Sequence, residues 1–336
     1  MVKKIRLLFA RGLEIEFCDR GKAVEQVEEL ARKGTRFPLV VFGPEGCGKS
    51  AWLKQAIEIL RDYGFEALYT DLLNREYIVH TGVKDVIEKL SEAVADVIGC
   101  TPIKLANLIV LLVKQLIGKW RKKRIALLLD EVFQAIGLDK AEVYVKMLLN
   151  IIEYPPESYE NIVVIITTSE GLTRSRIGRH LWAEITPMWN MSRRGFEELY
   201  EKIPKPKPDF DEVWMCTGGN PRALSLLYQM NWDVESLVNR FVKEKELTSD
   251  FISKWRRWLE LAVEDPDTLW NPDTPKTLVE ELIARNFIVY NMYERDQKLW
   301  IDEPPPHKAL EIGVGRYVAW QTPLHREAVR KALGEL

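Results

Sequence analysis

Between residues 39 and 189, the hydrophobic and polar positions alternate between two patterns. Short, almost continuous apolar runs are followed by longer stretches in which apolar residues recur every three or four positions. This succession is typical of parallel βαβ units, whose strands are covered by helices on both faces. The runs predict strands at residues 39–42, 67–70, 125–129, 163–167 and 184–185. The longer stretches predict helices at residues 50–63, 83–98, 103–122 and 141–153.

After Trp189 the pattern becomes mainly helical. Helices are predicted first at residues 192–203, 209–215, 221–229 and 234–246. A last segment begins near Leu247, where helices are predicted at residues 249–263 and 275–285. Strand-like runs then follow at residues 287–293, 298–302 and 316–321. Helices followed by two or three strands are the order of a winged helix-turn-helix.

The composition describes a globular chain with an internal core and more than one domain. Of its 336 residues, 46% are hydrophobic and 29% are charged, which excludes disorder or a coiled-coil rod as the main architecture. The 48 basic and 50 acidic residues give a net charge of −2. No overall positive field therefore attracts nucleic acid or an anionic membrane.

Nothing in the sequence predicts export or a membrane span. Met1 is followed by a short apolar run without a small-residue cleavage site. The longest apolar stretch, residues 103–117, is interrupted by polar residues and is shorter than the roughly 20 residues that a span needs. The cysteines form no CxxC pair, which favours a cytoplasmic, reducing location over a disulfide or zinc scaffold. They are Cys18, Cys47, Cys100 and Cys216.

The strongest chemical pattern is GxxxxGK[ST], which directly follows the predicted strand 39–42 and opens the next predicted helix. Glycines allow backbone N–H groups to surround an anion, and the helix N-terminus adds its own donors and dipole. Lys49 supplies a charge for the β- and γ-phosphates of a nucleotide, and the Ser50 hydroxyl can ligate Mg²⁺. We therefore expect a phosphate site formed by Gly43, Pro44, Glu45, Gly46, Cys47, Gly48, Lys49, Ser50 and Ala51.

A second acidic pattern completes the expected site. The predicted strand 125–129 ends in Asp130 and Glu131, so both carboxylates emerge at the carboxyl edge of the sheet, where the phosphate loop also begins. Asp130 is expected to hold Mg²⁺, mostly through water, as a Walker B aspartate. Glu131 is placed to polarise the attacking water, which favours hydrolysis over binding alone.

The strand 163–167 also ends in polar residues. It leads into Thr167, Thr168 and Ser169, hydroxyls that can orient the attacking water or detect the γ-phosphate, and Thr168 is our candidate for this role of sensor 1. Three arginines follow, any of which could reach a γ-phosphate in cis or in trans. Their pattern does not single one out: they are Arg174, Arg176 and Arg179.

Together these residues resemble the AAA+-like P-loop ATPases, and among them the archaeal ATPase family placed with the STAND signalling NTPases. Besides the two Walker motifs and the sensor strand, two further segments carry the resemblance. Residues 17–20 look like the family's N-terminal "F-x-D/G-R-E" box, although Gly21 stands where an acidic residue is usual. Residues 218–224 read GGNPRAL, which looks like the lid motif. The resemblance covers residues 17–242; the repeat arrays that STAND proteins commonly carry are absent.

The resemblance implies a fold and several site residues. It implies an α/β fold with an AAA+-like P-loop core and parallel sheet in residues 1–190, a helical lid in 191–246, and a winged-helix-like α+β domain in 247–336. It also implies ATP and ADP as ligands, with Mg²⁺. Asp19 and Arg20 are expected near the adenine, Pro221 beside the base, and Arg222 as a phosphate-sensing residue like sensor 2.

The leading functional hypothesis is an ATP-hydrolysing switch in which the nucleotide state controls the lid and the C-terminal module. An unidentified protein partner and nucleotide-dependent self-association are expected with it. The alternative is a DNA-associated regulator or mobile-element ATPase that acts through the winged helix. From Arg240 onward, fifteen Lys/Arg stand against seventeen Asp/Glu, a charge balance that does not favour DNA binding. A third hypothesis, structural nucleotide binding without turnover, is disfavoured by Glu131.

Overall fold

The computed structural model describes residues 3–96, 101–169 and 171–335, and the described chain separates into two compact units. Unit 1 contains residues 3–5, 21–42 and 49–186, apart from the gaps, and unit 2 contains residues 6–20, 43–48 and 187–335. Residues 43–48 therefore belong to unit 2 through their contacts, although the segments on either side of them belong to unit 1.

Unit 1 is built on a six-stranded sheet with the order β5-β4-β6-β7-β3-β8. Four strands form a parallel array, in which β4 pairs with β6, β6 with β7, and β7 with β3. The apolar runs therefore predicted the parallel strands correctly. The strands are β3 (Leu39–Phe42), β4 (Glu66–Asp71), β5 (Glu76–His80), β6 (Arg124–Asp130), β7 (Asn161–Thr168) and β8 (Glu184–Pro187).

Strand β5 was not predicted from the sequence. It pairs antiparallel with β4 through a short connection, and every one of its residues is only partly buried. An edge strand of this kind lacks the continuous apolar run by which the buried strands were recognised. The sheet is thus mixed, with β5 antiparallel to β4 beside the four parallel strands.

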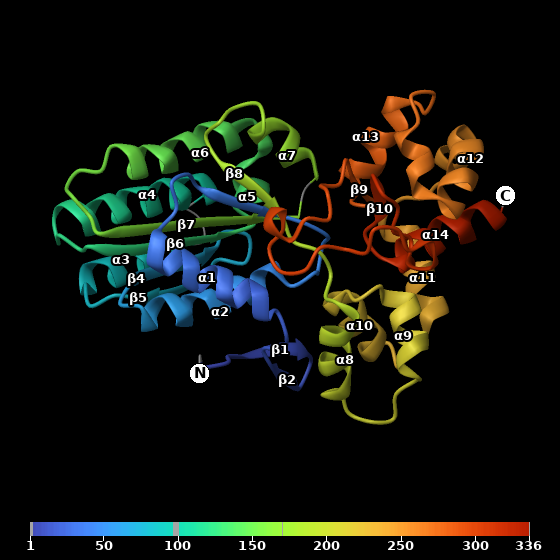
Figure 1. The fold of residues 1–336 in the computed structure, drawn as a ribbon, viewed down its shortest axis with the longest axis horizontal. Helices are drawn as coiled ribbons and strands as arrows, with labels where there is room; N and C mark the ends of the chain where they lie inside the picture. The colour runs from blue at the N-terminus through green and yellow to red at the C-terminus, as the bar shows by residue number, and fades with distance from the viewer. Residues whose placement is uncertain (1–2, 97–100, 170, 336) are drawn as a thin grey trace. The chain divides into compact units, whose positions relative to one another are not determined.

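Helices cover both faces of this sheet (Figure 1). Helices α1 (Gly21–Lys33) and α2 (Lys49–Asp62) contact each other and the sheet on one face. On the other face, apolar side chains of β4, β6 and β7 form a single core with α3 (Lys84–Ala95), α4 (Pro102–Gly118) and α6 (Leu138–Glu153). The short α5 (Val132–Ile136) and α7 (Gly171–Ile177) complete the unit.

The predicted helices of unit 1 exist, but their ends differ. Helix α4 stops at Gly118, not at residue 122, and it begins at Pro102 after Thr101, whose side chain accepts a bond from the Lys104 N–H at 3.4 Å. That start follows the usual preference for a hydroxyl at the N-cap and proline in the first turn. The expected end of the preceding helix, at residues 97–98, lies outside the described residues, as does Cys100. Among the described residues, no helix is long and apolar enough to cross a membrane.

Unit 2 begins with an N-terminal hairpin that the sequence pattern did not predict, because its two strands are short and contain few buried residues. Its other elements are helical, apart from one antiparallel strand pair near the end. The strands are β1 (Arg6–Ala10), β2 (Leu13–Glu16), β9 (Ile288–Tyr290) and β10 (Val318–Trp320). The helices are α8 (Arg193–Glu201), α9 (Phe210–Thr217), α10 (Pro221–Gln229), α11 (Val234–Glu244), α12 (Ser249–Glu264), α13 (Lys276–Ala284) and α14 (Pro323–Gly334).

The last segment shows the expected order of helices followed by strands, with two corrections. Residues 298–302 are not a strand: a 3₁₀ turn (Gln297–Leu299) is followed by a single bridge between Ile301 and Met188. The apolar residues there serve burial, because Trp300 packs in a cluster with Trp189 and Met292. The final helix, α14, was also not predicted.

The two helical regions of unit 2 share one hydrophobic core. Apolar side chains of α10 and α11, including Leu227 and Leu237, pack in the same cluster as those of α12, α13 and α14. Trp320 of β10 lies fully buried within it and donates its indole N–H to the carbonyl of Ala262 at 3.2 Å. A continuous core of this kind couples α10 and α11 mechanically to the region 247–336.

Candidate functional site

The first part of the candidate site is the end of strand β6, in unit 1. Asp130, its last residue, is completely buried and pairs in register with Asp71 of β4 and Thr167 of β7. Its carboxylate accepts bonds from the Tyr69 hydroxyl, at 3.1 Å, and from the Thr167 hydroxyl. Burial, together with the nearby carboxylates, raises the pKa of Tyr69, so this hydroxyl stays a donor.

Glu131 follows directly and is held by Ser169, the residue after β7. The carboxylate accepts one bond from the Ser169 hydroxyl at 2.5 Å and one from the Ser169 N–H at 3.1 Å. Burial raises the pKa of Glu131, while the charge of Lys49 and the bonds from Ser169 act in the opposite direction. A carboxylate with a raised pKa and a fixed orientation is suited to accept a proton.

The backbone at Glu131 is also unusual. Its φ of 46° and ψ of 31° place it in the left-handed region, directly before α5. Side chains other than Gly, Asn and Asp rarely adopt this conformation. The Glu131 N–H nevertheless finds a partner, since it donates to the carbonyl of Thr167 at 3.1 Å. The turn therefore directs the carboxylate toward Ser169 at a conformational cost.

The remaining predicted residues of unit 1 lie at the start of α2 and on β7. Lys49, the first residue of α2, is 4% exposed, whereas Ser50 is exposed and Ala51 half-buried. Thr168 is fully buried and pairs in register with Phe42, the last residue of β3. It lies on the opposite face of β7 from Thr167, because side chains alternate along a strand.

The second part of the candidate site is the loop Gly43–Gly48, which belongs to unit 2. A Cβ at Gly43 would lie 1.9 Å from the carbonyl oxygen of Met188, and one at Gly46 would lie 2.3 Å from the Cβ of Arg222. Gly46 also has a φ of +77° and Gly48 one of +105°. These positions therefore require glycine for close approach as well as for backbone conformation.

Three consecutive carbonyl groups of this loop accept bonds from other segments of unit 2. The Glu45 carbonyl accepts from Asn220 Nδ2 at 2.9 Å, and the Gly46 carbonyl from the Arg222 N–H at 3.3 Å. The Cys47 carbonyl accepts from the Arg20 guanidinium. In a trans peptide the N–H points away from the C=O, so the amides of Gly46 and Gly48 face the other side of the loop. The Cys47 N–H donates to the Pro44 carbonyl at 3.2 Å. Loop amides that face one side in this way form an anion-binding concavity.

Arg20 is 3% exposed and makes several bonds. Its Nη2 donates to the Cys47 carbonyl and, at 3.0 Å, to the Trp189 carbonyl, and its Nη1 pairs with Asp302 at 2.8 Å. The guanidinium thus lies against the backbone of the loop. The preceding residue, Asp19, packs close to Gly195, at the start of α8, and burial raises its pKa.

Asn220 and Gln321 hold Glu45 from both sides. While Asn220 donates to the Glu45 carbonyl, Gln321 Oε1 accepts from the Glu45 N–H at 2.8 Å. Asn190 connects the two holders, because it accepts from Asn220 at 2.8 Å and donates to the Gln321 carbonyl at 2.9 Å. All three side chains are at most 3% exposed. The sequence analysis named none of them as site residues.

Of these three residues, Asn220 could have been identified from the sequence. Asn220 precedes Pro221 and caps α10, accepting from the Ala223 N–H at 3.0 Å, as expected for Asn before a proline in the first turn. The preceding helix, α9, ends at Thr217 with Gly218 in a left-handed C-cap. Gln321, Asn190 and Asp302 carry no comparable signal, because segments far apart in the sequence bring them to the loop.

The candidate arginines differ in their surroundings. The side chain of Arg222 is exposed, and its guanidinium has no acceptor among the residues that the structure describes. Arg174 of α7 lies over the Phe42 ring, 5.0 Å from its centroid. Arg176 and Arg179 are exposed. Within the described ranges, no three His, Cys, Asp or Glu residues gather in a way that could hold a metal ion.

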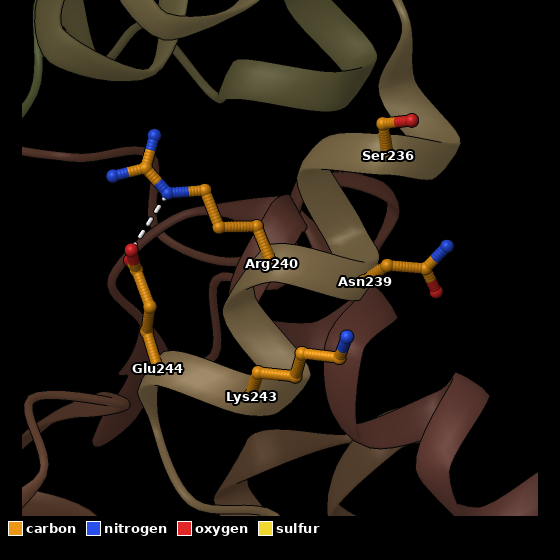
Figure 2. A pocket seen from close by; sticks show the side chains of 5 residues that line it. All are labelled: Ser236, Asn239, Arg240, Lys243 and Glu244. Carbon is orange, nitrogen blue, oxygen red and sulfur yellow. Dashed lines mark hydrogen bonds and ion pairs between the residues drawn. The ribbon is translucent and has the colours of Figure 1, made fainter.

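A hollow lies on the surface of α11 (Figure 2). Its volume is about 390 Å³, and one helix supplies the residues that line it. Within it, Arg240 pairs with Glu244 at 2.7 Å, which neutralises one of its two basic groups. The hollow contains none of the predicted site residues. It is lined by Ser236, Asn239, Arg240, Lys243 and Glu244.

A parallel sheet with a GxxxxGKS loop after one strand and a buried Asp-Glu end on another defines a P-loop nucleoside triphosphatase fold. A family of ATPase domains found predominantly in Archaea matches residues 17–227. The chain belongs to this family, and the resemblance drawn from the sequence is confirmed. The expected fold class, an α/β P-loop core followed by a helical region and an α+β end, is confirmed as well.

Solved structures show only a distant likeness. Cdc6p from Pyrobaculum aerophilum is 14% identical, with 98% of this chain and 99% of that chain covered and a TM-score of 0.41. AMPPCP-bound DnaA from Aquifex aeolicus is 14% identical, with 76% and 74% covered and a TM-score of 0.37. The RuvB branch migration motor of Thermotoga maritima is 11% identical, with 79% and 82% covered and a TM-score of 0.35. No curated protein matches this chain.

Proposed function

We propose that the protein binds ATP with Mg²⁺ and hydrolyses it. The observation that carries this proposal is the orientation of Glu131 by Ser169 beside the charge of Lys49, at the end of a buried strand. Structural nucleotide binding alone would not require a carboxylate with a raised pKa fixed in a left-handed turn. The ordered amides of the loop supply the other requirement, a concavity for phosphate oxygens.

Each residue has a role in this proposal. Lys49 neutralises the β- and γ-phosphates, and the amides of Gly46, Gly48 and the first residues of α2 donate to phosphate oxygens. Ser50 and Asp130 supply oxygen ligands, the kind that Mg²⁺ prefers. The two bonds that Asp130 accepts leave further lone pairs for metal-bound water, so the donor set fits this ion. Bound Mg²⁺ would neutralise charge on the phosphates.

The chemistry follows from Glu131. Its carboxylate takes a proton from a water molecule while the water oxygen attacks the γ-phosphorus, and the bond to the β-phosphate oxygen breaks, giving ADP and phosphate. Thr168, buried beside Phe42 in register, is the proposed γ-phosphate sensor. Asp19 and Arg20 are proposed to lie near the adenine, and Pro221 beside the base.

The finer proposal is a nucleotide-controlled switch of the STAND type, with a core in 1–190, a lid in 191–246 and a winged-helix-like module in 247–336. The shared core of α10–α14 supports it in one respect. A change that Arg222 senses in the lid would reach the C-terminal module as a movement of a rigid body. An unidentified protein partner and nucleotide-dependent self-association belong to this proposal.

The C-terminal helices do not favour DNA as the output. Three of their basic side chains are paired with carboxylates: Arg256 with Glu260 at 3.0 Å, and both Lys254 and Arg285 with Glu281 at 3.6 Å. A helix that grips DNA presents basic side chains free to neutralise phosphates. We therefore favour a protein over DNA as the binding partner of this module.

The decisive experiment replaces Lys49 and measures binding and turnover. We expect Lys49→Ala to abolish Mg-ATP binding by calorimetry and phosphate release. Lys54→Ala is the matched control, because Lys54 lies on the same helix but pairs with Glu76 at 2.7 Å. Unchanged affinity and turnover in Lys49→Ala would contradict the phosphate-loop assignment.

A further inference from the structure

We propose that Asp302, in the C-terminal part of the chain, is a positioning residue for the phosphate loop and acts on it through Arg20. The inference deepens the proposed function, on which it rests. Arg20 and Asp302 are separated by 282 positions in the sequence, yet their side chains pair at 2.8 Å. With 3% and 4% of their side chains exposed, they form a buried ion pair.

Burial makes each partner depend on the other. A charged group taken out of water is tolerated only when it is paired and its remaining donors or acceptors are satisfied. Here Asp302 neutralises the guanidinium through Nη1, while Nη2 is left to the carbonyls of Cys47 and Trp189. The planar, rigid fork of arginine transmits this orientation directly, since fixing one nitrogen fixes the other.

The orientation matters for the peptide between Cys47 and Gly48. Its carbonyl points to Arg20, so its N–H points to the opposite side of the loop. Gly48 has a φ of +105°, a conformation that only glycine adopts readily, and glycine also allows this peptide to rotate. Without the bond from Arg20, the Gly48 amide would no longer be held toward the phosphate side.

Asp302 is itself fixed by the C-terminal segment. Its φ is +62°, its carbonyl accepts from the Gln297 side chain, and the neighbouring Ile301 bridges to Met188. A rearrangement of this segment would therefore move Asp302 and release Arg20. By linkage, nucleotide binding would in turn stabilise the arrangement of the segment. This contact gives the C-terminal part a direct route to the phosphate loop.

The test compares Asp302→Asn with the wild-type protein. Asparagine tolerates a left-handed backbone and has the same shape, so the substitution removes the charge and little else. We expect ATP and ADP affinities, measured by calorimetry, to fall at least tenfold. We also expect amide hydrogen exchange of residues 43–50 in the nucleotide-free protein to become at least tenfold faster.

The matched control is Asp267→Asn. Asp267 also organises the C-terminal segment, accepting bonds from the N–H groups of Arg316, Tyr317 and Val318, but it makes no bond to the loop among the described residues. The control should leave exchange at residues 43–50 unchanged. Arg20→Lys, which keeps the charge but not the fork, is the second variant, and it should speed exchange in the loop while the melting temperature shows the protein to be folded.

The outcomes separate the two proposals. Wild-type exchange and affinity in folded Asp302→Asn would overturn the positioning role, whatever the nucleotide chemistry. If the wild-type protein bound no nucleotide, the proposed function would fail. The exchange measurement in the nucleotide-free protein would still decide whether Asp302 orders the loop.

Discussion

The two parts of the candidate site are held in different ways. At the end of β6, the functional groups are side chains, and neighbouring strands of the same sheet fix them: Thr167 bonds to Asp130, and Ser169 bonds to Glu131. In the loop Gly43–Gly48, the functional groups are backbone amides, and side chains from distant segments fix them. The first arrangement follows from local strand register, the second from the tertiary structure.

This difference predicts how each part responds to mutation. Changes at the strand end should alter the chemical step, because binding does not depend on Glu131 or Ser169. Changes in the residues that hold the loop should alter nucleotide affinity and stability together, because the same bonds serve both. The following substitutions test that division.

The largest effect is expected from Glu131→Gln. The amide cannot accept the proton of the attacking water, so turnover should fall about a hundredfold or more, while ATP affinity stays near that of the wild type. Rapid-quench measurement of a single turnover, with calorimetry for affinity, separates the two quantities. A wild-type rate would mean that Glu131 only caps α5 and that another group positions the water. Asp130→Asn should instead change the dependence on Mg²⁺ concentration.

Asn220→Ala is expected to lower nucleotide affinity and stability, and to leave the chemical step unchanged. It removes the cap of α10, worth about 1 kcal/mol, and leaves buried acceptors on Glu45 and Asn190 unpaired, at about 1–3 kcal/mol. Nucleotide affinity should fall about tenfold and the melting temperature should drop, with little change in the rate of the bound complex. Thr248→Ala is the control, because Thr248 caps α12 without contacting the loop. If both variants bind ATP equally well, Asn220 is only a helix cap.

A smaller effect is expected from Ser169→Ala. The bond from the Ser169 hydroxyl lowers the pKa of Glu131, against burial, which raises it. Without that bond the pKa should rise further, so the acidic limb of the pH–rate profile, where the base becomes protonated, should move to higher pH. At pH values within that limb, the rate should fall below that of the wild type. Steady-state rates across the pH range are the measurement, and an unmoved acidic limb would show that Ser169 does not tune the base.

The smallest effect is expected from Arg222→Ala. The side chain is exposed and unpaired within the described ranges, so stability should hardly change. If Arg222 senses the γ-phosphate, ATP affinity should fall severalfold more than ADP affinity. The ATP-dependent change in proteolysis after Leu247 should also disappear. Equal and unchanged affinities, with an intact digestion pattern, would exclude a sensor role.

The buried parallel strands and the acidic strand end could be predicted from the sequence, because each depends on neighbouring residues. A buried parallel strand must be apolar throughout, and Asp130 emerges wherever such a strand ends. Gly43 and Gly46 were also predictable as members of a motif. The sequence did not predict why these positions require glycine, because the clashes that a Cβ would make there involve the distant residues Met188 and Arg222.

The residues that hold the loop could not be predicted in the same way. Arg20 was expected near the base, but its bond to Cys47 depends on Asp302, in a segment that the sequence suggested was a strand. Gln321 follows a three-residue strand, and the apolar pattern of that strand does not predict a contact with Glu45. Contacts across such long sequence separations leave no periodicity in either partner. Tertiary structure alone brings these residues together.

The left-handed backbone of Glu131 implies a conflict between folding stability and catalytic turnover. A non-glycine residue in this conformation costs about 1–2 kcal/mol, and the buried carboxylate adds a desolvation cost. Glu131→Gly would relieve both and leave the protein without its proposed base. Laboratory evolution that selects for heat resistance alone should favour that substitution, since active-site residues commonly lower folding stability. The glutamate would persist only under selection for ATP consumption. Its presence at this position is therefore evidence that hydrolysis is under selection.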